Sequence, residues 1–310
     1  MKIIGVDVGG TSIKIGIFEE DAILTEKWEI QTRTQNNGEL IVTDIVNSVK
    51  AKLEEKVIPM REIKGIGIGI PGPVTGDGEV EVCVNLGWRD KKLGKELNKL
   101  LGIPVKVGND GNVAALGEAW QGAGKGRKNI VVITLGTGIG AGIIIDEKIV
   151  SGVHGLSGEI GHMHVNNAEE EICNCKGKGC LEQYSSATGI VRQAKHLLEN
   201  SNISSILRQY GEEISAKDIL DAAKMGDSMA VEIAECAGRY LGMAFANTSL
   251  LIDPEAFIIG GGVSKVGKYL IDIIEKHYRG YLKLSEKKAE ICPAMLGNDA
   301  GIYGAAKMVL

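Results

Sequence analysis

The sequence predicts an α/β protein with two similar lobes on either side of a cleft. Apolar runs typical of β-strands alternate with segments that have the apolar spacing of helices, which indicates an α/β fold. A hairpin pattern with a glycine-rich, hydroxyl-bearing tip occurs twice, at 3–18 and at 130–145. Glycine makes up 43 of the 310 residues and gathers at expected strand ends, where a backbone turns sharply or approaches a ligand. The repeat therefore predicts two lobes that each begin with the same motif.

The expected elements follow the chain in a regular order. The first hairpin turns at Gly9-Gly10-Thr11-Ser12 and the second at Gly136-Thr137-Gly138. A strand is expected at 64–70, ending in Pro71-Gly72-Pro73, and another at 105–107, which leads through Gly108-Asn109-Asp110 into a helix at 113–120. Further along we expect a helix at 228–251. The last of these strands, at 256–259, ends in Gly260-Gly261-Gly262 before a helix through Tyr278. We expect a smaller lobe at 1–117, on which a helix at 298–310 packs, and a larger lobe at 118–297.

The composition limits the classes of function. An apolar fraction of 44% is ample for two cores, and a net charge of −5 argues against nucleic acid or an anionic membrane as the main partner. No apolar run approaches the ~20 residues that span a bilayer. The chain starts with Met1-Lys2 directly before a strand and lacks the pattern of a cleavable signal, so we expect a cytoplasmic protein.

One histidine and three cysteines lie close together and have the composition of a tetrahedral zinc site: His162, Cys173, Cys175 and Cys180. A disulfide is disfavoured in a reducing cytosol, and the other three cysteines stand singly, as small apolar residues do. His164 and His154 are weaker alternatives to His162. Glu159 and Glu182 interleave with these ligands but are not needed by zinc, which suggests a structural metal with a polar ligand bound beside it.

The two hairpin tips have the composition of phosphate-binding loops. Backbone N–H groups at a tight glycine turn and neighbouring hydroxyls bind anions. One such turn can be an ordinary hairpin, whereas a matching pair suits a polyphosphate held between two lobes. A base and ribose can lie against the bare backbone of Gly260–Gly262. Asp7 is a candidate for holding Mg²⁺, directly or through water, while Lys14 either assists with charge or is a solvated strand residue.

Asp110 is the candidate general base. A carboxylate within hydrogen-bond reach of a substrate hydroxyl accepts its proton as the oxygen attacks phosphorus. Asn109 and Asp110 are equally suited to capping the following helix, so this motif alone leaves both roles open. The phosphate loops favour the catalytic role, and the set as a whole indicates phosphoryl transfer to a polyol, whose hydroxyls pair with carboxylates and amides.

These residues resemble the ROK family of bacterial sugar kinases, repressors and related proteins, and the likeness covers nearly the whole chain. It is carried by Asp7–Thr11, Pro71-Gly72-Pro73, Asn109-Asp110, Leu135–Gly138, Gly158–His162, the cysteine cluster through Glu182, and Gly260–Ser264. Within the family the chain is most similar to the glucokinases of Gram-positive bacteria, on the segments 84–88, 114–118 and 186–191.

The resemblance implies a two-lobed actin-like, hexokinase-type ATPase fold with duplicated RNase H-like lobes and a zinc-stabilised loop. It implies ATP-dependent phosphorylation of the glucose 6-hydroxyl with Mg²⁺, and Asp110 stands at the position of the catalytic base. The implied sugar contacts are Gly72, Asn85, Asn109, Asp110, Glu159, His162 and Glu182. The expected nucleotide contacts are Asp7, Gly9, Gly10, Thr11, Lys14, Gly136, Thr137, Gly138, Gly261 and Gly262. The implied zinc ligands are His162, Cys173, Cys175 and Cys180.

The chain departs from the family pattern in the zinc loop. A glycine usually follows the second cysteine in the family, but Lys176 stands there in this chain. The ligand spacing is unchanged, so zinc is still expected, with a shift in loop geometry. The acidic run 169–171 lies between the first two ligands and is expected to be a solvated loop.

Other functions remain to be weighed. A kinase for N-acetylglucosamine, N-acetylmannosamine or fructose would use the same motifs. A sugar-sensing regulator of the same family would carry an N-terminal helix-turn-helix module, whereas the first hairpin begins here at residue 3. A zinc module without catalysis would leave the phosphate loops unexplained. The family often forms dimers or tetramers, so we expect a homo-oligomer.

Overall fold

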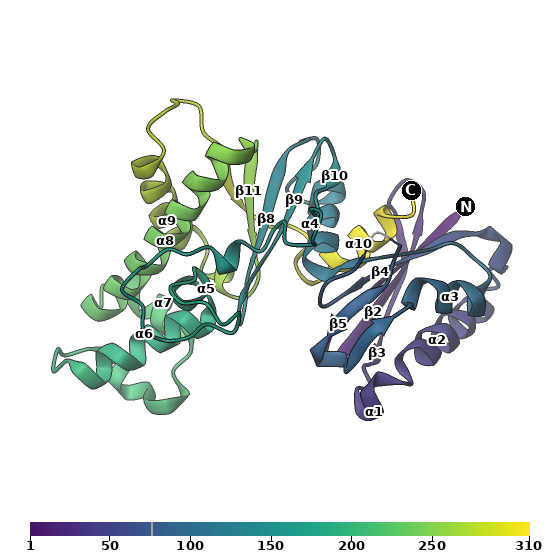
Figure 1. Ribbon diagram of the computed structural model, residues 1–310, viewed down its shortest axis with the longest axis horizontal. Coiled ribbons are helices and arrows are strands. Elements are labelled where there is room, and N and C mark those ends of the chain that lie inside the picture. The colour runs from purple at the N-terminus through teal and green to yellow at the C-terminus, as the bar shows by residue number, and fades with distance from the viewer. Residues whose placement is uncertain (76) are drawn as a thin grey trace. The chain divides into compact units, whose positions relative to one another are not determined.

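The computed structural model describes residues 1–75 and 77–310 and divides the chain into two compact units (Figure 1). The segments are 1–126, 142–157 and 296–310 for unit 1, and 127–141 and 158–295 for unit 2. Both chain termini therefore belong to unit 1. The lobe boundaries expected from the sequence stay a prediction.

Unit 1 is built on a five-stranded sheet of order β3-β2-β1-β4-β7. Its strands are β1 (Lys2–Val8), β2 (Ser12–Glu19), β3 (Leu24–Gln31), β4 (Ile63–Ile70) and β7 (Val105–Asn109). The antiparallel pair β1–β2 confirms the first predicted hairpin, and β4 pairs in parallel with β1 and β7. The register places Asp7 opposite Lys14 on β2 and Gly69 on β4, so Asp7 lies where β1 enters the glycine turn.

Helices and a two-stranded ribbon complete unit 1. These elements are α1 (Gln35–Gly38), α2 (Ile41–Glu55), β5 (Val80–Cys83), β6 (Trp88–Lys91), α3 (Leu93–Leu101), α4 (Asp110–Gln121) and α10 (Ala300–Lys307). Successive side chains of β1 point to opposite faces of the sheet. Ile4 packs with α2 in the larger core, while Ile3 packs against Ile302 of α10 in a smaller one. A Cβ at Gly5 would lie 2.1 Å from the carbonyl oxygen of Ile302, so α10 approaches the sheet closely because glycine stands there.

Glu118 is a buried carboxylate at the end of α4, with 2% of its surface exposed. One oxygen accepts a hydrogen bond from the Ala123 N–H at 2.9 Å, and the other accepts one from the Leu296 N–H at 2.8 Å. Both partners lie next to positions where the chain passes between the units, after Gly126 and after Met295. Glu118 therefore fixes the unit 1 ends of two connecting segments, and its burial is offset by these hydrogen bonds.

The second sheet has the order β10-β9-β8-β11-β12. Its strands are β8 (Ile130–Leu135), β9 (Ile139–Ile145), β10 (Lys148–Ile149), β11 (Ala256–Gly260) and β12 (Glu290–Pro293). The division between the units falls within β9, between Ala141 and Gly142. The predicted second hairpin is present, because Gly136–Gly138 joins β8 to β9 and the Gly136 N–H donates to the Gly138 carbonyl at 3.0 Å.

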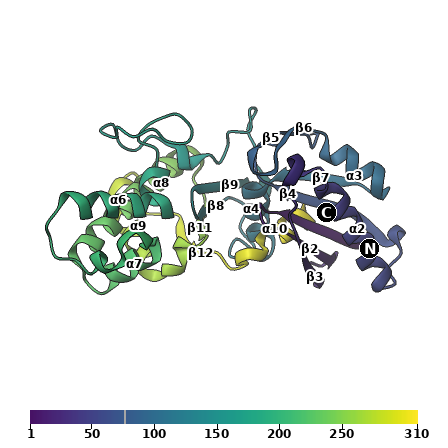
Figure 2. The same ribbon diagram turned by 90° about the horizontal axis from the view of Figure 1, so that it is seen from below.

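The helices of unit 2 pack on one another (Figure 2). They are α5 (Glu182–Ser185), α6 (Ala187–Asn200), α7 (Ala216–Lys224), α8 (Ser228–Ile252) and α9 (Lys268–Tyr281). Phe257 of β11 joins two of them to the sheet, because its ring stacks on Phe245 at 4.3 Å and meets Tyr278 edge-on at 5.8 Å. The predicted helix at 228–251 and the predicted strand at 256–259 are both confirmed, as α8 and β11.

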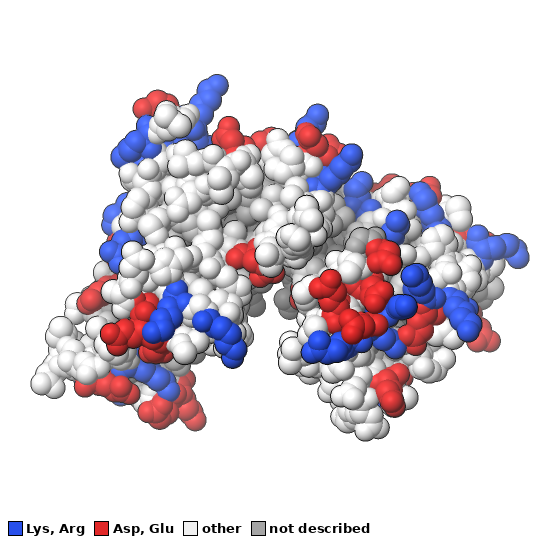
Figure 3. All heavy atoms as spheres, viewed as in Figure 1, with Lys and Arg blue, Asp and Glu red and all other residues white. Residues whose placement is uncertain are grey.

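Short 3-10 helices connect the larger elements. They are η1 (Met60–Glu62), η2 (Val84–Leu86), η3 (Ile160–His162), η4 (Ile206–Glu213), η5 (Val263–Val266) and η6 (Gly297–Asp299). Within the described part of the chain, no helix is both long enough and apolar enough to cross a bilayer. Acidic and basic side chains are intermixed on the face shown in Figure 3.

Candidate functional site

The first glycine turn exposes its tip to solvent at Gly10 and Thr11. The turn is closed by a hydrogen bond from the Gly9 N–H to the Ser12 carbonyl at 2.9 Å, and the Thr32 hydroxyl donates to the Gly9 carbonyl at 2.7 Å. A Cβ at Gly10 would meet no atom within 4 Å. These hydrogen bonds fix the base of the turn, while its tip at Gly10 is open to solvent, which allows phosphate oxygens to approach the backbone.

Asp7 lies beside this turn, and its surroundings disfavour its negative charge. Burial raises the pKa of Asp7 to about 6, while Lys14 counteracts part of this shift and the charge of Asp110 adds to it. Lys14 is also held in place, since its ammonium donates to the Asn298 carbonyl at 3.1 Å. A bound divalent cation would relieve the cost of charging Asp7, so the residue fits the expected Mg²⁺ role.

Asn109, and not Asp110, caps helix α4. The Asn109 side chain accepts a hydrogen bond from the Asn112 N–H at 3.1 Å, and the helix begins at Asp110, three residues earlier than predicted. Asp110 Oδ1 accepts from the Gly111 N–H at 2.8 Å and from the Asn109 amide at 3.1 Å. The capping role that the sequence left open for both residues is thus filled by Asn109, and the exposed carboxylate of Asp110 is oriented by two donors.

The structure brings three of the expected sugar contacts of unit 1 to the same place. The Asn109 amide donates to the Gly72 carbonyl at 3.2 Å. Gly72 has φ +98°, and a Cβ there would lie 2.4 Å from the Val82 carbonyl oxygen, so the backbone conformation and the space both require glycine. Burial raises the pKa of the Cys83 thiol, and the negative charge of Asp110 raises it further. Strand β5, which ends at Cys83, therefore ends near the Asp110 carboxylate. The exposed Asn85 follows two residues later in η2.

The second and third glycine turns lie together in unit 2. Gly261 has φ +89°, and a Cβ there would lie 2.4 Å from the carbonyl oxygen of Leu135, the residue just before the second turn. The Ser264 hydroxyl donates to the Gly261 carbonyl at 2.7 Å and holds the third turn. A Cβ at Gly262 would meet nothing within 4 Å. The two sets of expected nucleotide contacts in unit 2 are therefore neighbours.

Ile139 of β9 is the point around which the expected sugar contacts of unit 2 gather. Its N–H donates to Glu182 Oε2 at 2.9 Å. A Cβ at Gly161 would lie 2.4 Å from its carbonyl oxygen, so η3, which carries His162 at its end, packs against the same residue. Glu159 precedes η3, is exposed, and accepts a hydrogen bond from the His162 N–H through its backbone carbonyl at 3.0 Å.

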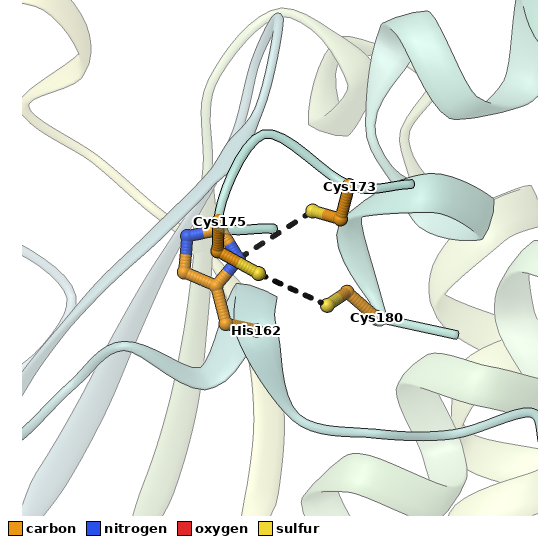
Figure 4. Close-up of side chains that lie close together, drawn as sticks. All are labelled: His162, Cys173, Cys175 and Cys180. Atoms are coloured by element: carbon orange, nitrogen blue, oxygen red, sulfur yellow. Dashed lines mark hydrogen bonds between the residues drawn. The ribbon is translucent and has the colours of Figure 1, made fainter. Parts of the chain in front are cut away.

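The four expected zinc ligands point toward one another (Figure 4). The ligand atoms of His162, Cys173, Cys175 and Cys180 all lie within 4.8 Å of one another. His162 Nδ1 is 3.8 Å from Cys173 Sγ, and the Sγ atoms of Cys175 and Cys180 are 3.5 Å apart. The separations of 3.8 and 3.5 Å suit the edges of a tetrahedron with metal–ligand bonds of roughly 2.0–2.3 Å. His162 uses Nδ1 toward the thiols, which leaves Nε2 on the other side of the ring (Figure 4).

The chemistry of this cluster also fits a divalent cation. Burial and the neighbouring thiols raise the pKa of Cys180 to about 12, because a second negative charge is unfavourable there. A metal ion reverses that preference by deprotonating its thiol ligands. The alternative ligand His164 is engaged elsewhere, since its ring nitrogens contact the Lys178 carbonyl at 2.8 Å and the Asn167 side chain at 2.6 Å.

Lys176 has a backbone conformation that favours glycine. Its φ is +72°, in the left-handed region, whereas the following Gly177 does not have a positive φ. The Lys176 N–H donates to the Cys173 carbonyl at 2.8 Å, which closes the turn between two cysteines of the cluster. A lysine here adopts a conformation that costs a residue with a Cβ roughly 1 kcal/mol or more. The expected shift of the loop relative to the family stays a prediction.

The prediction that residues 169–171 form a solvated loop is wrong for Glu169. Only 9% of its side chain is exposed, and its Oε2 is 2.5 Å from the guanidinium of Arg192 and accepts from the Tyr184 hydroxyl at 2.6 Å. Arg192 lowers the pKa of Glu169 to about 2. Glu171, which is exposed, also pairs with Arg192 at 3.1 Å. Helix α6 thus holds the segment between the first two ligands through an ion pair that the local sequence does not reveal.

A cavity of about 610 Å³ opens beside the second glycine turn. Its lining includes Thr137, Thr188, Val191, Lys195, Ser215 and Ala216. This volume is typical of small-molecule sites. The lining residues of α6 and α7 were not predicted as part of the site. The sequence feature that could have indicated them is the segment 186–191, which is part of the family resemblance but contains no residue pattern typical of a binding site.

Comparisons with known proteins agree along the whole chain. The model of the ROK family matches residues 3–310. A glucokinase from Halalkalibacterium halodurans is 42% identical over 310 residues, which cover 99% of this chain and 94% of that protein. An N-acetyl-D-glucosamine kinase from Vibrio cholerae is 33% identical over 315 residues, with 97% of each covered. The solved structure of a ROK family glucokinase from Streptomyces griseus, in complex with glucose and AMPPNP, is 35% identical and superposes with a TM-score of 0.75 over 99% of both chains.

Proposed function

The chain belongs to the ROK family, and we propose that it is a glucokinase of that family, which transfers the γ-phosphoryl group of ATP to the 6-hydroxyl of glucose. The observation that carries the proposal is the capped Asn109–Asp110 turn, which fixes a carboxylate at the start of α4. The glucokinase from Halalkalibacterium halodurans supports it through 42% identity over almost the full length of both chains.

Asp110 is the proposed general base. Its Oδ1 is held by the Gly111 N–H and the Asn109 amide, so the carboxylate is oriented before substrate binds. It accepts the proton of the 6-hydroxyl as that oxygen attacks the γ-phosphorus, and the bond from the γ-phosphorus to the β–γ bridging oxygen breaks to release ADP.

The nucleotide is assigned to the glycine turns. We propose that the β- and γ-phosphates bind the backbone at Gly9–Thr11 and Gly136–Gly138, with Lys14 adding positive charge. The adenosine part is proposed to occupy the 610 Å³ cavity beside Thr137, with Gly261 and Gly262 as further backbone contacts. Mg²⁺, when bound with the nucleotide, would neutralise charge on the β- and γ-oxygens, and Asp7 is the proposed residue near it.

The sugar is assigned to polar side chains of both units. The proposed hydroxyl contacts are Gly72, Asn85, Asn109 and Asp110 in unit 1, and Glu159, His162 and Glu182 in unit 2. Carboxylates and amides suit a polyol because its hydroxyls both donate and accept. With zinc held by His162, Cys173, Cys175 and Cys180, the ring plane and tautomer of His162 would be fixed and Nε2 would face the sugar. Zinc in this role is structural and takes no part in phosphoryl transfer.

One coupled assay tests the activity. The protein is incubated with ATP, Mg²⁺ and one sugar at a time, and ADP formation is followed for glucose, N-acetylglucosamine, N-acetylmannosamine and fructose. We expect the highest kcat/KM with glucose. The Vibrio cholerae relative favours N-acetylglucosamine as the second candidate substrate. A higher kcat/KM for that sugar would replace the glucose assignment, and no ADP formation with any sugar would refute the kinase assignment.

We also propose a cytoplasmic location and a homo-oligomer. Cys83, Cys173, Cys175, Cys180 and Cys236 are in no disulfide bond, which is the state that a reducing compartment preserves. Sedimentation of the purified protein, in the presence and absence of glucose, measures the number of chains in the assembly.

A further inference from the structure

The carboxylate of Glu182 contacts the tip of the second glycine turn, and we propose that this contact couples sugar binding to nucleotide binding. The inference rests on the proposed function, in which Glu182 binds a sugar hydroxyl and the turn binds phosphate. It adds a positioning role, because one side chain would then set the place of both ligands.

The geometry gives the two carboxylate oxygens of Glu182 different surroundings. Oε2 accepts the hydrogen bond from the Ile139 N–H at 2.9 Å. A Cβ at Gly138 would lie 2.2 Å from the same oxygen, so the carboxylate rests directly against the turn. Oε1 has no hydrogen-bond partner among the described side chains and backbone, which leave out residue 76 and the side chains of 265 and 266. One oxygen therefore holds the turn, and the other remains for a sugar hydroxyl.

The residues that follow Glu182 hold the rest of the turn. The Ala187 N–H donates to the Gly136 carbonyl at 2.8 Å, and the Thr188 hydroxyl donates to the Thr137 carbonyl at 2.7 Å. These carbonyls are anchored from the side of α6, which leaves the exposed Thr137 at the tip. The segment 182–188 thus contacts each of the three turn residues 136–138. We therefore expect the segment and the turn to move together.

The residues on either side of Glu182 connect it to the proposed zinc ligands. The N–H of the fully buried Leu181 donates to the Met163 carbonyl at 2.9 Å, next to His162. The Gln183 side chain accepts from the Cys180 N–H at 3.0 Å. Glu182 is therefore fixed at its base by the loop that carries the proposed sugar contact His162, and at its tip by the proposed phosphate loop.

This arrangement predicts a reciprocal effect between the two ligands. Phosphate bound at 136–138 orders the turn and with it the carboxylate of Glu182, so a sugar that binds afterwards loses less conformational freedom. By thermodynamic linkage, sugar bound to Oε1 must favour nucleotide binding by the same factor.

The test changes the turn and keeps every proposed sugar-contact residue, but it moves the carboxylate of Glu182 away from the turn. Gly138→Ala inserts a methyl group where Oε2 lies, and the flexible carboxylate is displaced while the backbone conformation stays accessible. Glucose affinity is measured by calorimetry without nucleotide, and we expect it to fall about tenfold, because the displaced carboxylate no longer holds Oε1 in place for the charge-assisted hydrogen bond to a sugar hydroxyl. Gly140→Ala is the matched control, since a Cβ at that position meets nothing within 4 Å, and its glucose affinity should equal that of wild type.

A second measurement is specific to coupling. The ratio of glucose dissociation constants without and with saturating AMPPNP should exceed one in wild type and fall toward one in Glu182→Asp, whose shorter side chain cannot reach both partners. The double variant should lose no more coupling than either single variant, because all three lack the same contact. If Gly138→Ala does not fold, as judged by its thermal transition, Glu182→Asp carries the test alone.

The outcomes separate this proposal from the proposed function. Wild-type protein that binds no glucose in the titration refutes the function on which the proposal rests. Wild-type protein that binds glucose equally well with and without AMPPNP refutes the coupling alone. Unchanged glucose affinity in a folded Gly138→Ala variant would also overturn the role of Glu182.

Discussion

A methyl group at Gly301 would lie 2.4 Å from Cγ of Asp7, so helix α10 is in direct contact with the carboxylate at the end of β1. The contact joins residues from the two ends of the chain. It also explains the burial that raises the pKa of Asp7 to about 6, because the backbone of α10 at Gly301 covers this carboxylate. A side chain at position 301 would displace the carboxylate.

Replacing Gly301 with alanine should impair the use of nucleotide. We expect Gly301→Ala to displace the Asp7 carboxylate and to raise the KM for Mg-ATP by about tenfold or more, with glucose affinity unchanged. Steady-state kinetics with each substrate varied in turn measure both effects. Gly280→Ala in α9 is the matched control, because a Cβ there meets nothing within 4 Å. An unaltered KM for Mg-ATP in Gly301→Ala would show that the position of Asp7 does not matter for nucleotide binding.

Asp110→Asn should remove proton transfer while keeping sugar binding. Asparagine has the shape of aspartate and an acceptor oxygen, but it cannot take a proton from the 6-hydroxyl, so we expect kcat to fall by roughly 10²–10⁴-fold. Calorimetry should show glucose affinity within a few-fold of wild type. Asp21→Asn, in an exposed turn of unit 1, provides the comparison. A near-normal kcat in Asp110→Asn would end its assignment as the base.

Removal of zinc should lower both stability and sugar affinity. Without the metal the three thiols lose their common centre, and His162 loses the bond that fixes its ring. We expect a lower thermal transition temperature and weaker glucose binding after treatment with a chelator, and recovery of both on addition of Zn²⁺. Cys173→Ser should contain no zinc, whereas Cys236→Ser should keep one ion per chain. Chelated protein with unchanged stability and glucose affinity would contradict the proposed role.

Lys176→Gly should stabilise the zinc loop. Glycine adopts a φ of +72° without the steric cost that a Cβ imposes, and part of this gain is offset by the greater freedom of glycine in the unfolded chain. We expect the free energy of unfolding to rise by roughly 0.5–1 kcal/mol in urea titrations. Lys176→Ala removes the same charge and keeps the Cβ, so it should give no gain. Equal stability of the glycine and alanine variants would mean that the backbone conformation at this position is not strained.

The ion pair of Glu169 should make stability depend on pH in the acidic range. The pKa of Glu169 is lowered from 4.5 to about 2 by Arg192, so its contribution is complete above pH ~5 and is lost as the pH falls toward 2. The shift corresponds to roughly 3 kcal/mol as an order of magnitude. Wild type and Glu169→Gln are unfolded with urea at pH 7, 5 and 3, both after metal removal. We expect the difference in their free energies of unfolding to be largest at pH 7 and to shrink toward pH 3; a constant difference would show that the pair does not titrate in this range.

The sequence predicted the elements that depend on local patterns. Both glycine hairpins, the long helix α8 and the strand before Gly260 follow from apolar spacing and turn residues, which act over a few neighbours. The four residues of the cysteine cluster could be named together because their spacing is itself the signal. The helix at Asp110 was expected three residues too late, because a cap is formed by one side-chain hydrogen bond and leaves no trace in apolar periodicity.

The features that the sequence did not predict depend on partners far along the chain. Glu169 looked like part of a solvated acidic run, yet Arg192 and Tyr184 take it out of solvent. The cavity beside Thr137 needs α6 and α7 to be placed next to a turn more than fifty residues earlier in the chain. Contacts of this kind arise from tertiary packing, which a single sequence does not encode in any short window.

The C-terminal position of α10 has a consequence for the synthesis of the protein on the ribosome. Ile3 and Phe18 are fully buried, and they pack with Ile302 and Ala306 of this last helix. They leave the ribosome long before their packing partners, which follow only after the whole of 127–299 has been translated; this takes roughly 10–30 s at 5–20 residues per second. During that interval the growing chain carries an uncovered apolar face on its first sheet. Unit 1 therefore completes its fold only after α10 has been translated, although it also contains residues made almost 300 positions earlier.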